Sequence, residues 1–228
     1  NGVVTFTQSG TTTIAAAGDI ISDGAVTISS GGGTTTSADV TTTADAIQFA
    51  SATGLGDAVA LVSAGGAVTF TSTLDNAQNL TITAAAGNVS FSGAVGGSTR
   101  LGTLNIVTAG DVTAGALTLA AFDQDAGTGT TTLGGAVDTN AAGGVVVANT
   151  NLAVNAAVTT TGNGVVTFTQ SGTTTIAAAG NIVSDGAVTV TSGGGTTTSA
   201  DVTTTADAIQ FASNTAVNAD LTLNTTSG

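Results

Sequence analysis

A long internal repeat constrains the fold of this chain more than any other feature of its sequence. Residues 1–53 return as residues 163–215, and the two copies differ at five positions. The differing pairs are Asp19/Asn181, Ile21/Val183, Ile28/Val190, Ser29/Thr191 and Ala52/Asn214. Repetition of this kind indicates a chain of structural units that stack on their neighbours.

A shorter period lies inside the long one. A phrase of the form Ile-x-Ala-Ala-Gly-Asp/Asn-Ile/Val recurs, with small variations, around Gly18, Gly87, Gly110 and Gly180. Counting seven steps from Gly18 to Gly180 gives an average step of about 23 residues, which is typical of solenoid repeats. We therefore expect residues 1–228 to form a single β-solenoid segment of about ten turns, with roughly 23 residues in each turn.

Short strands are indicated inside each step by an alternation of apolar and small polar residues. In Val68-Thr69-Phe70, a period of two places Val68 and Phe70 on one face of a strand and Thr69 on the other. The same alternation recurs at residues 4–6, 26–28, 80–82, 89–91, 104–106, 117–119, 188–190 and 221–223. Turn residues such as Asp23-Gly24 separate these segments, so the sequence predicts many short strands joined by tight corners.

No segment carries the 3.6-residue apolar stripe of a helix. Three alanine triplets, at residues 15–17, 84–86 and 177–179, lie beside glycine and do not extend into such a stripe. We expect these triplets to pack inward at the corners of the coil. The fold class that the sequence predicts is thus all-β, a parallel β-helix without helices.

Stacking explains why this pattern favours a coil of strands. One turn cannot bury its apolar face alone, but stacked turns can, because each strand pairs with its equivalents about 4.8 Å above and below. Ten such turns would form a rod about 48 Å long. A sandwich of short strands is the alternative fold, although a sandwich has no reason to keep a constant step.

The composition excludes several classes of function. The chain has a net charge of −13, and Arg100 is its only basic residue, which argues against binding to nucleic acid. Hydrophobic residues make up 41% of the chain and charged residues 7%, which argues against disorder. No apolar run approaches the roughly 18 residues of a membrane helix, so we expect no transmembrane segment.

Three longer phrases resemble the repeat regions of filamentous-haemagglutinin-like adhesins, in particular those of giant bacterial surface proteins. These phrases are GNVSFSGAVGG at residues 87–97, LGTLNIVTAGDVTAGALTL at residues 101–119 and TTTLGGAVDTNAAGGVVV at residues 130–147. The resemblance extends over essentially the whole chain. It implies a right-handed parallel β-helix that is exported across the cell envelope and displayed as a long fibre on the bacterial cell surface.

The residue types needed for catalysis and for cofactor binding are mostly missing. His, Cys, Lys, Glu and Tyr are absent, which leaves aspartate as the only common acid–base residue. The densest acidic cluster, Asp123 and Asp125, lies in the least regular segment, residues 122–129. Two carboxylates could serve glycoside hydrolysis or contact Ca²⁺. In a glycine-flanked loop we interpret them as a solvated turn, and we expect no catalytic, cofactor-binding or metal-binding residues and no enzyme.

The sequence is compatible with two functions. The chain is expected to be an extracellular structural filament or an adhesin shaft, which continues into more repeats or stacks end to end with its own copies. The alternative is a module whose outer Thr, Asn and Asp residues bind surface glycans or a host surface. A localised site should interrupt the repeat, and residues 122–129 are where such an interruption would lie.

Overall fold

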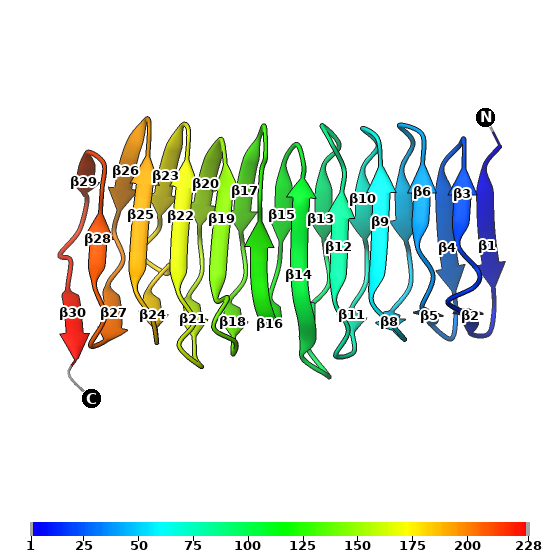
Figure 1. The fold of residues 1–228 in the computed structure, drawn as a ribbon, viewed down its shortest axis with the longest axis horizontal. Coiled ribbons are helices and arrows are strands. Elements are labelled where there is room, and N and C mark those ends of the chain that lie inside the picture. The colour runs from blue at the N-terminus through cyan, green and yellow to red at the C-terminus, as the bar shows by residue number, and fades with distance from the viewer. Residues whose placement is uncertain (1, 227–228) are drawn as a thin grey trace.

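The computed structural model describes residues 2–226, which form thirty β-strands and contain no helix. Figure 1 shows the strands lying side by side across an elongated molecule, with the two termini at its opposite ends. The pairings between neighbouring strands are parallel, as in Val26↔Ile47 and Ile47↔Val68. The predicted parallel β-solenoid is therefore confirmed.

Each turn of the chain contributes strands to three sides of the coil. The first side is an unbroken sheet of eleven strands. These strands are β1 (Val4–Gln8), β4 (Val26–Ser30), β7 (Ile47–Phe49), β10 (Val68–Phe70), β13 (Val89–Phe91), β15 (Val112–Ala114), β17 (Thr130–Leu133), β20 (Asn151–Val154), β23 (Thr173–Ile176), β26 (Gly195–Thr198) and β29 (Thr215–Val217).

The second and third sides meet in the middle of the molecule. The second side has β2 (Thr12–Ile14), β5 (Thr34–Thr36), β8 (Thr53–Leu55), β11 (Leu74–Asp75), β18 (Val137–Thr139), β21 (Val158–Thr160), β24 (Ile182–Ser184), β27 (Val202–Thr205) and β30 (Leu223–Thr226). The third side has β3 (Ile20–Ser22), β6 (Val40–Thr42), β9 (Val59–Ser63), β12 (Leu80–Thr83), β14 (Leu101–Thr108), β19 (Val145–Asn149), β22 (Val166–Gln170), β25 (Val188–Ser192) and β28 (Ile209–Phe211). The long strand β16 (Leu117–Gln124) pairs with β18 through its first half and with β19 through its second half, so it joins the two sides.

The turn is shorter than expected: about 21 residues, which makes about eleven turns instead of ten. The predicted step was too long because the recurring glycine phrase does not stay at one corner. Gly18 lies between β2 and β3, Gly87 between β12 and β13, and Gly180 between β23 and β24. These are three different corners, so the intervals between the phrases are not whole numbers of turns.

The long repeat is also not a whole number of turns. The strand β1 lies on the first side of the first turn, whereas its copy β22 lies on the third side of the eighth turn. The two copies are therefore separated by seven turns and two further sides. Nearly the same sequence folds on two different sets of sides, which indicates that the three sides impose closely similar packing requirements.

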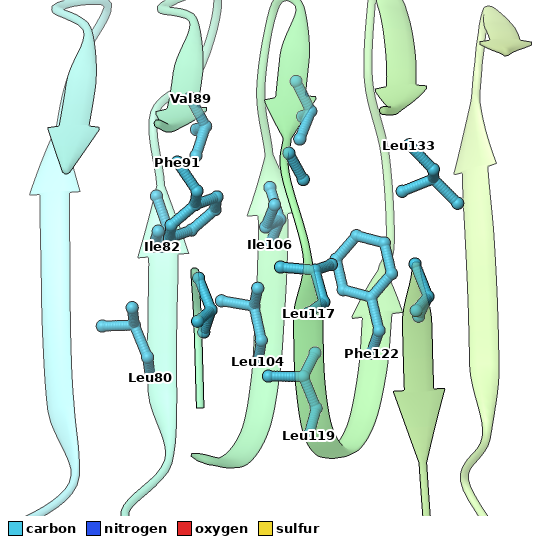
Figure 2. Packing of buried hydrophobic residues seen from close by; sticks show 14 of the residues in the cluster. Leu80, Ile82, Val89, Phe91, Leu104, Ile106, Leu117, Leu119, Phe122 and Leu133 are labelled. Atoms are coloured by element: carbon cyan, nitrogen blue, oxygen red, sulfur yellow. The ribbon is translucent and has the colours of Figure 1, made fainter. Parts of the chain in front are cut away.

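The interior is filled by ladders of apolar side chains. Inward residues alternate with outward ones, so Val68 and Phe70 are buried while Thr69 faces outward. The rings of Phe49, Phe70 and Phe91 stack in register, with centroids 5.0 and 5.4 Å apart and interplanar angles of 6° and 9°. Figure 2 shows aliphatic side chains and Phe91 and Phe122 filling the space between the strands. Successive turns place similar side chains one above another, and these stacked side chains form a continuous core along the coil.

Hydroxyl groups also lie inside the coil, although the sequence led us to expect threonine on the outside. In β5, alternation turns Thr34 and Thr36 inward, where they are 4% and 0% exposed. Their partners are other inward polar groups. In the second copy, the Thr174 hydroxyl is 2.7 Å from Gln170 Oε1 and 2.6 Å from Ser192 Oγ. Hydrogen bonding between successive turns makes this burial tolerable.

The alanine triplets lie at corners, as expected, but mostly do not pack inward. Residues 15–17 are exposed, and in the second triplet Ala84 is buried while Ala85 is exposed. Ala85 has a positive φ of 51°. The triplets serve to turn the chain, and small side chains fit this tight geometry.

Aspartate and asparagine side chains connect successive turns at the corners. The backbone N–H of Thr130 donates to Asp111 Oδ1 at 2.8 Å, and the N–H of Asp111 donates to Asn88 Oδ1 at 2.8 Å. In the repeat, Asp19 accepts from Asp39 N and its counterpart Asn181 accepts from Asp201 N, both at 3.0 Å. Replacement of Asp19 by Asn181 thus preserves the acceptor, which explains that difference between the copies.

Removing one of these acceptors should destabilise the coil locally. We expect Asp111→Ala to lower the free energy of unfolding by about 1 kcal/mol, because the N–H of Thr130 loses its partner. Asp111→Asn, which keeps the acceptor, should stay within about 0.5 kcal/mol of the parent protein. Urea unfolding followed by circular dichroism measures both variants. Equal losses for Ala and Asn would show that charge, and not the hydrogen bond, matters at this corner.

Candidate functional site

Residues 122–124 end β16 on the third side, and residues 125–129 form the corner that leads to β17 on the first side. Phe122 and Gln124 point inward from β16, and Asp123 and Asp125 occupy the alternate positions. Partial burial raises the pKa of Asp123, and the nearby carboxylate of Asp125 raises it further. In the described part of the chain the one basic side chain, Arg100, pairs with Asp138, so the acidic pair Asp123 and Asp125 offers little for binding an anion.

The unusual feature of this corner is a pair of inward amides, which sequence reasoning missed. The Thr131 hydroxyl donates to Gln124 Oε1 at 2.6 Å and accepts from Asn149 Nδ2 at 2.7 Å. In the described part of the chain, Gln124 Nε2 and Asn149 Oδ1 are buried without a hydrogen-bond partner. For Gln124, the signal that could have found it is an amide at an inward position of a strand, between the two acidic residues. Asn149 is brought to it only by the stacking of turns.

Glycine makes room for these amides. A Cβ at Gly127 would lie 2.7 Å from Gln124 Nε2 and 2.9 Å from Asn149 Cβ. An open groove of about 360 Å³ runs beside them. Its lining includes Asp125, Ala126, Gly127, Ala148, Asn149, Thr169, Gln170 and Ser171. The segment that we expected to interrupt the repeat thus lies beside two buried amides and an open groove.

A second kind of groove occurs twice, once in each copy of the long repeat. The grooves have volumes of about 230 and 330 Å³ and are open to solvent. The first is lined by Thr11, Gly32, Gly33, Thr34, Thr35, Ala52, Thr53, Gly54, Thr73 and Asp75, and the second by Thr173, Gly194, Gly195, Thr196, Thr197, Asn214, Thr215 and Ala216. Threonine and glycine are the commonest residues in both linings. Such open grooves suit weak, repeated contacts better than one tight ligand.

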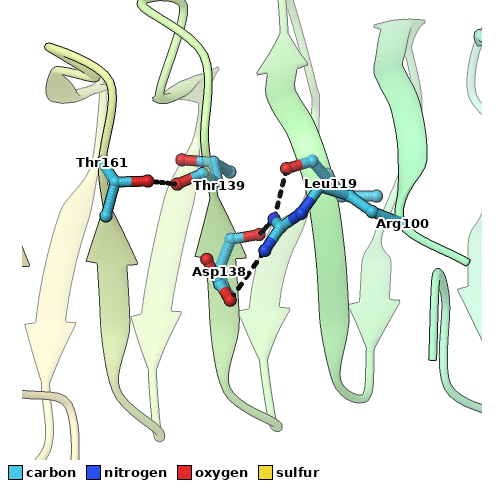
Figure 3. A network of polar contacts seen from close by, with 5 residues as sticks. All are labelled: Arg100, Leu119, Asp138, Thr139 and Thr161. Carbon is cyan, nitrogen blue, oxygen red and sulfur yellow. Dashed lines mark hydrogen bonds and ion pairs between the residues drawn. The ribbon is translucent and has the colours of Figure 1, made fainter. Parts of the chain in front are cut away.

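The single basic residue links three successive turns (Figure 3). One guanidinium nitrogen of Arg100 donates to the carbonyl oxygens of Leu119 and Asp138, at 2.7 and 2.9 Å. The other nitrogen forms an ion pair of 2.9 Å with the Asp138 carboxylate. Three oxygen atoms, one on Leu119 and two on Asp138, hold the Arg100 guanidinium group against two neighbouring turns. Its role is therefore structural.

We expect Arg100→Met to lower the free energy of unfolding by about 1–2 kcal/mol, because two carbonyl groups lose a charged donor. The partly exposed ion pair itself should contribute only a small share. The variant Thr99→Ala, at an exposed neighbouring position, is the matched control. Thermal unfolding compares the two, and an Arg100→Met protein as stable as Thr99→Ala would contradict the structural role.

The carboxylates at corners are engaged with the backbone. The pKa of Asp185 is lowered because its carboxylate accepts hydrogen bonds from the N–H of Asn163 and the hydroxyl of Thr205, at 2.8 Å each. Among residues 2–226, no group of three or more acidic, histidine or cysteine side chains could hold a metal ion. No helix long and apolar enough to cross a membrane occurs in that same range.

The lowered pKa of Asp185 predicts a pH dependence. A depressed pKa in the folded state stabilises the protein above the unfolded pKa of about 3.9, and this stability is lost as pH falls through the folded value. The parent protein should therefore lose stability more steeply than Asp185→Asn as the pH is lowered below about 4. Urea unfolding at pH values from neutral to below the folded pKa tests this, and parallel pH profiles would contradict it.

Comparisons of the chain with protein-family models, with curated proteins and with solved structures find no match. The structure establishes a parallel β-solenoid repeat protein. The likeness to filamentous-haemagglutinin-like adhesins stays a prediction from the sequence.

Proposed function

We propose that this chain is a segment of an extracellular structural filament or adhesin shaft, displayed on a bacterial cell surface. The observation that carries the proposal is the placement of residues 1–53 and of their copy on two different sets of sides. A shaft requires only that turns continue to stack, whereas a localised binding site requires one particular side. The second copy of the surface residues lies on other sides of the coil than the first. This arrangement supports a function as a rigid spacer and not as a site on one side.

The shape and stiffness of the protein in solution test this proposal. About eleven turns, each adding about 4.8 Å, should give a straight rod of about 50 Å. Small-angle X-ray scattering should yield this length and a constant cross-section at several salt concentrations. Electron microscopy of concentrated protein should show fibres. Diffraction from these fibres should contain a reflection at about 4.8 Å along the axis. A flexible or collapsed particle would overturn the assignment as a shaft.

A second candidate function is a module that binds surface glycans through the paired Thr–Gly grooves. Recurrence of the groove in both copies favours it. The first groove lies on the second side and the other on the first side, so a flexible polymer that passes around the rod could contact both and bind more tightly than at one. Thr35 and Thr197 are equivalent outward residues of the two grooves. On a glycan array, the double variant Thr35→Asp/Thr197→Asp should lose signal that each single variant retains in part. An array without signal for the parent protein would exclude this function for the glycans displayed.

A further inference from the structure

Two buried amides at the corner after β16 each keep one atom unpaired. Within residues 2–226, four buried side-chain atoms have no hydrogen-bond partner. Two of them, Gln124 Nε2 and Asn149 Oδ1, belong to side chains that meet at this corner through the Thr131 hydroxyl. Gln124 is 0% and Asn149 7% exposed, so both atoms are closed to solvent.

The hydrogen bonds around these amides determine which atoms stay unpaired. Asn149 Nδ2 donates to the carbonyl oxygen of Asn151 and to the Thr131 hydroxyl, each at 2.7 Å. The Thr131 hydroxyl donates its own proton to Gln124 Oε1 at 2.6 Å. Rotating the Asn149 amide would set its oxygen against the Asn151 carbonyl, and rotating the Gln124 amide would leave the Thr131 proton without an acceptor. One donor, Gln124 Nε2, and one acceptor, Asn149 Oδ1, therefore remain.

The next glutamine along the chain shows that this fold can satisfy a buried amide completely. Gln170 is 3% exposed, its Nε2 donates to the Val147 carbonyl oxygen at 2.9 Å, and its Oε1 accepts from Thr174 at 2.7 Å. Buried polar groups are nearly always paired in native proteins, because an unpaired one is costly. The unpaired atoms of Gln124 and Asn149 are therefore a local feature and not a general property of the coil.

An open groove of about 360 Å³ lies against these amides. A Cβ at Gly127 would lie 2.7 Å from Gln124 Nε2, so the Gln124 amide lies directly behind the groove wall at Gly127. A ligand in the groove reaches the two unpaired atoms when the backbone at Gly127 moves aside. The lining of the groove includes Asp125, Gly127, Asn149, Thr169 and Ser171.

The polar groups of this corner select the chemistry of a ligand. A hydroxyl group can accept from Gln124 Nε2 and donate to Asn149 Oδ1 through a single oxygen atom. The Asp125 carboxylate in the groove disfavours an anion, and the Gln124 donor disfavours a metal cation, which takes oxygen ligands. An apolar ligand would leave both amide atoms unpaired. A neutral sugar meets all of these requirements, because it carries several hydroxyl groups.

We propose that the corner after β16 is a binding site for a neutral sugar, in which one sugar hydroxyl is held between Gln124 Nε2 and Asn149 Oδ1. Further hydroxyls of the same sugar contact Asp125 and Ser171 in the groove. Gln124 and Asn149 lie between the two copies of the long repeat, so this is a localised site that the repeat does not duplicate. It is independent of the shaft function and lies apart from the Thr–Gly grooves.

Side-chain amide signals in the ¹⁵N NMR spectrum of the unaltered protein test this site directly. The probes are the methyl glycosides of glucose, galactose, mannose and N-acetylglucosamine, each titrated separately. We expect at least one probe to shift the side-chain N–H signals of Gln124 and Asn149 while the signals of Gln48, on the first side, stay in place. Unshifted Gln124 and Asn149 signals with all four probes would overturn the proposal.

A substitution at Gln124 tests the same site by affinity. Gln124→Met removes the unpaired donor and keeps a side chain of similar size, so we expect binding of the shifted probe to weaken about tenfold, the loss of one hydrogen bond. Gln48→Met removes an amide from the first side and is the matched control, which should bind like the parent protein. Circular dichroism confirms that each variant is folded before affinities are compared. Unchanged affinity in folded Gln124→Met protein would contradict the site.

The same spectra distinguish this site from other sites and other ligands. Shifts confined to Thr35 and Thr197 would place the sugar in the Thr–Gly grooves and overturn the site after β16. A response of Gln124 and Asn149 to the capped peptide N-acetylalanine methylamide, and to none of the glycosides, would assign the corner to a peptide and overturn the sugar. None of these results bears on the shaft, which is tested by the length of the rod.

Discussion

Phe70→Ala is expected to lower the free energy of unfolding by about 3–5 kcal/mol. Phe70 is 1% exposed and stacks between Phe49 and Phe91, so its removal leaves a cavity bordered by two rings. Each lost aromatic contact adds to the lost burial of the side chain. The strands on either side are tied by backbone hydrogen bonds and cannot collapse into the space. The loss should therefore lie near the upper part of this range.

Urea unfolding measured by circular dichroism tests this expectation, with Phe6→Ala as the matched control. Phe6 stands on the same side of the coil but at its end, where it is only partly buried. Its replacement should cost less than half as much, because part of the ring already contacts solvent. Equal losses would indicate that position in the stack does not matter, which contradicts the ladder as the source of stability.

Gly87→Ala is the second substitution with a large expected effect, a loss of about 2–3 kcal/mol. Gly87 follows β12 at a corner where successive turns approach closely. A Cβ there would fall well inside van der Waals contact of the Gly66 carbonyl, and one at Gly66 would collide with the Asp45 carbonyl. Both obstacles are backbone atoms of a neighbouring turn, so relief requires the turns to separate.

Gly10→Ala is the control, because a Cβ at Gly10 would have nothing within 4 Å. This variant should be as stable as the parent protein or slightly more stable, since alanine restricts the unfolded chain. Thermal unfolding of both variants, together with native-state hydrogen exchange at the corner after β12, gives the comparison. A Gly87→Ala protein that unfolds like Gly10→Ala would show that this corner has room for a methyl group.

Little of the candidate site could be predicted. The acidic pair Asp123 and Asp125 is apparent in the sequence, and it lies at the corner where the buried amides were found. The buried amides of Gln124 and Asn149, and the Thr131 hydroxyl between them, come from different turns. Their proximity depends on how many residues each turn contains, which no local pattern encodes. The paired grooves were hidden for the same reason, since each is assembled from several successive turns.

The sequence by itself determined that this chain forms short parallel strands stacked in a coil. Alternation such as Val68-Thr69-Phe70 is a local property of an extended backbone, and near-identical copies can bury such faces only by stacking. The tertiary structure alone decided the length of the turn and the side on which each strand lies. A glycine phrase turns the chain equally well at any of three corners, so only the pairing of whole turns settled that the two copies lie seven turns and two sides apart.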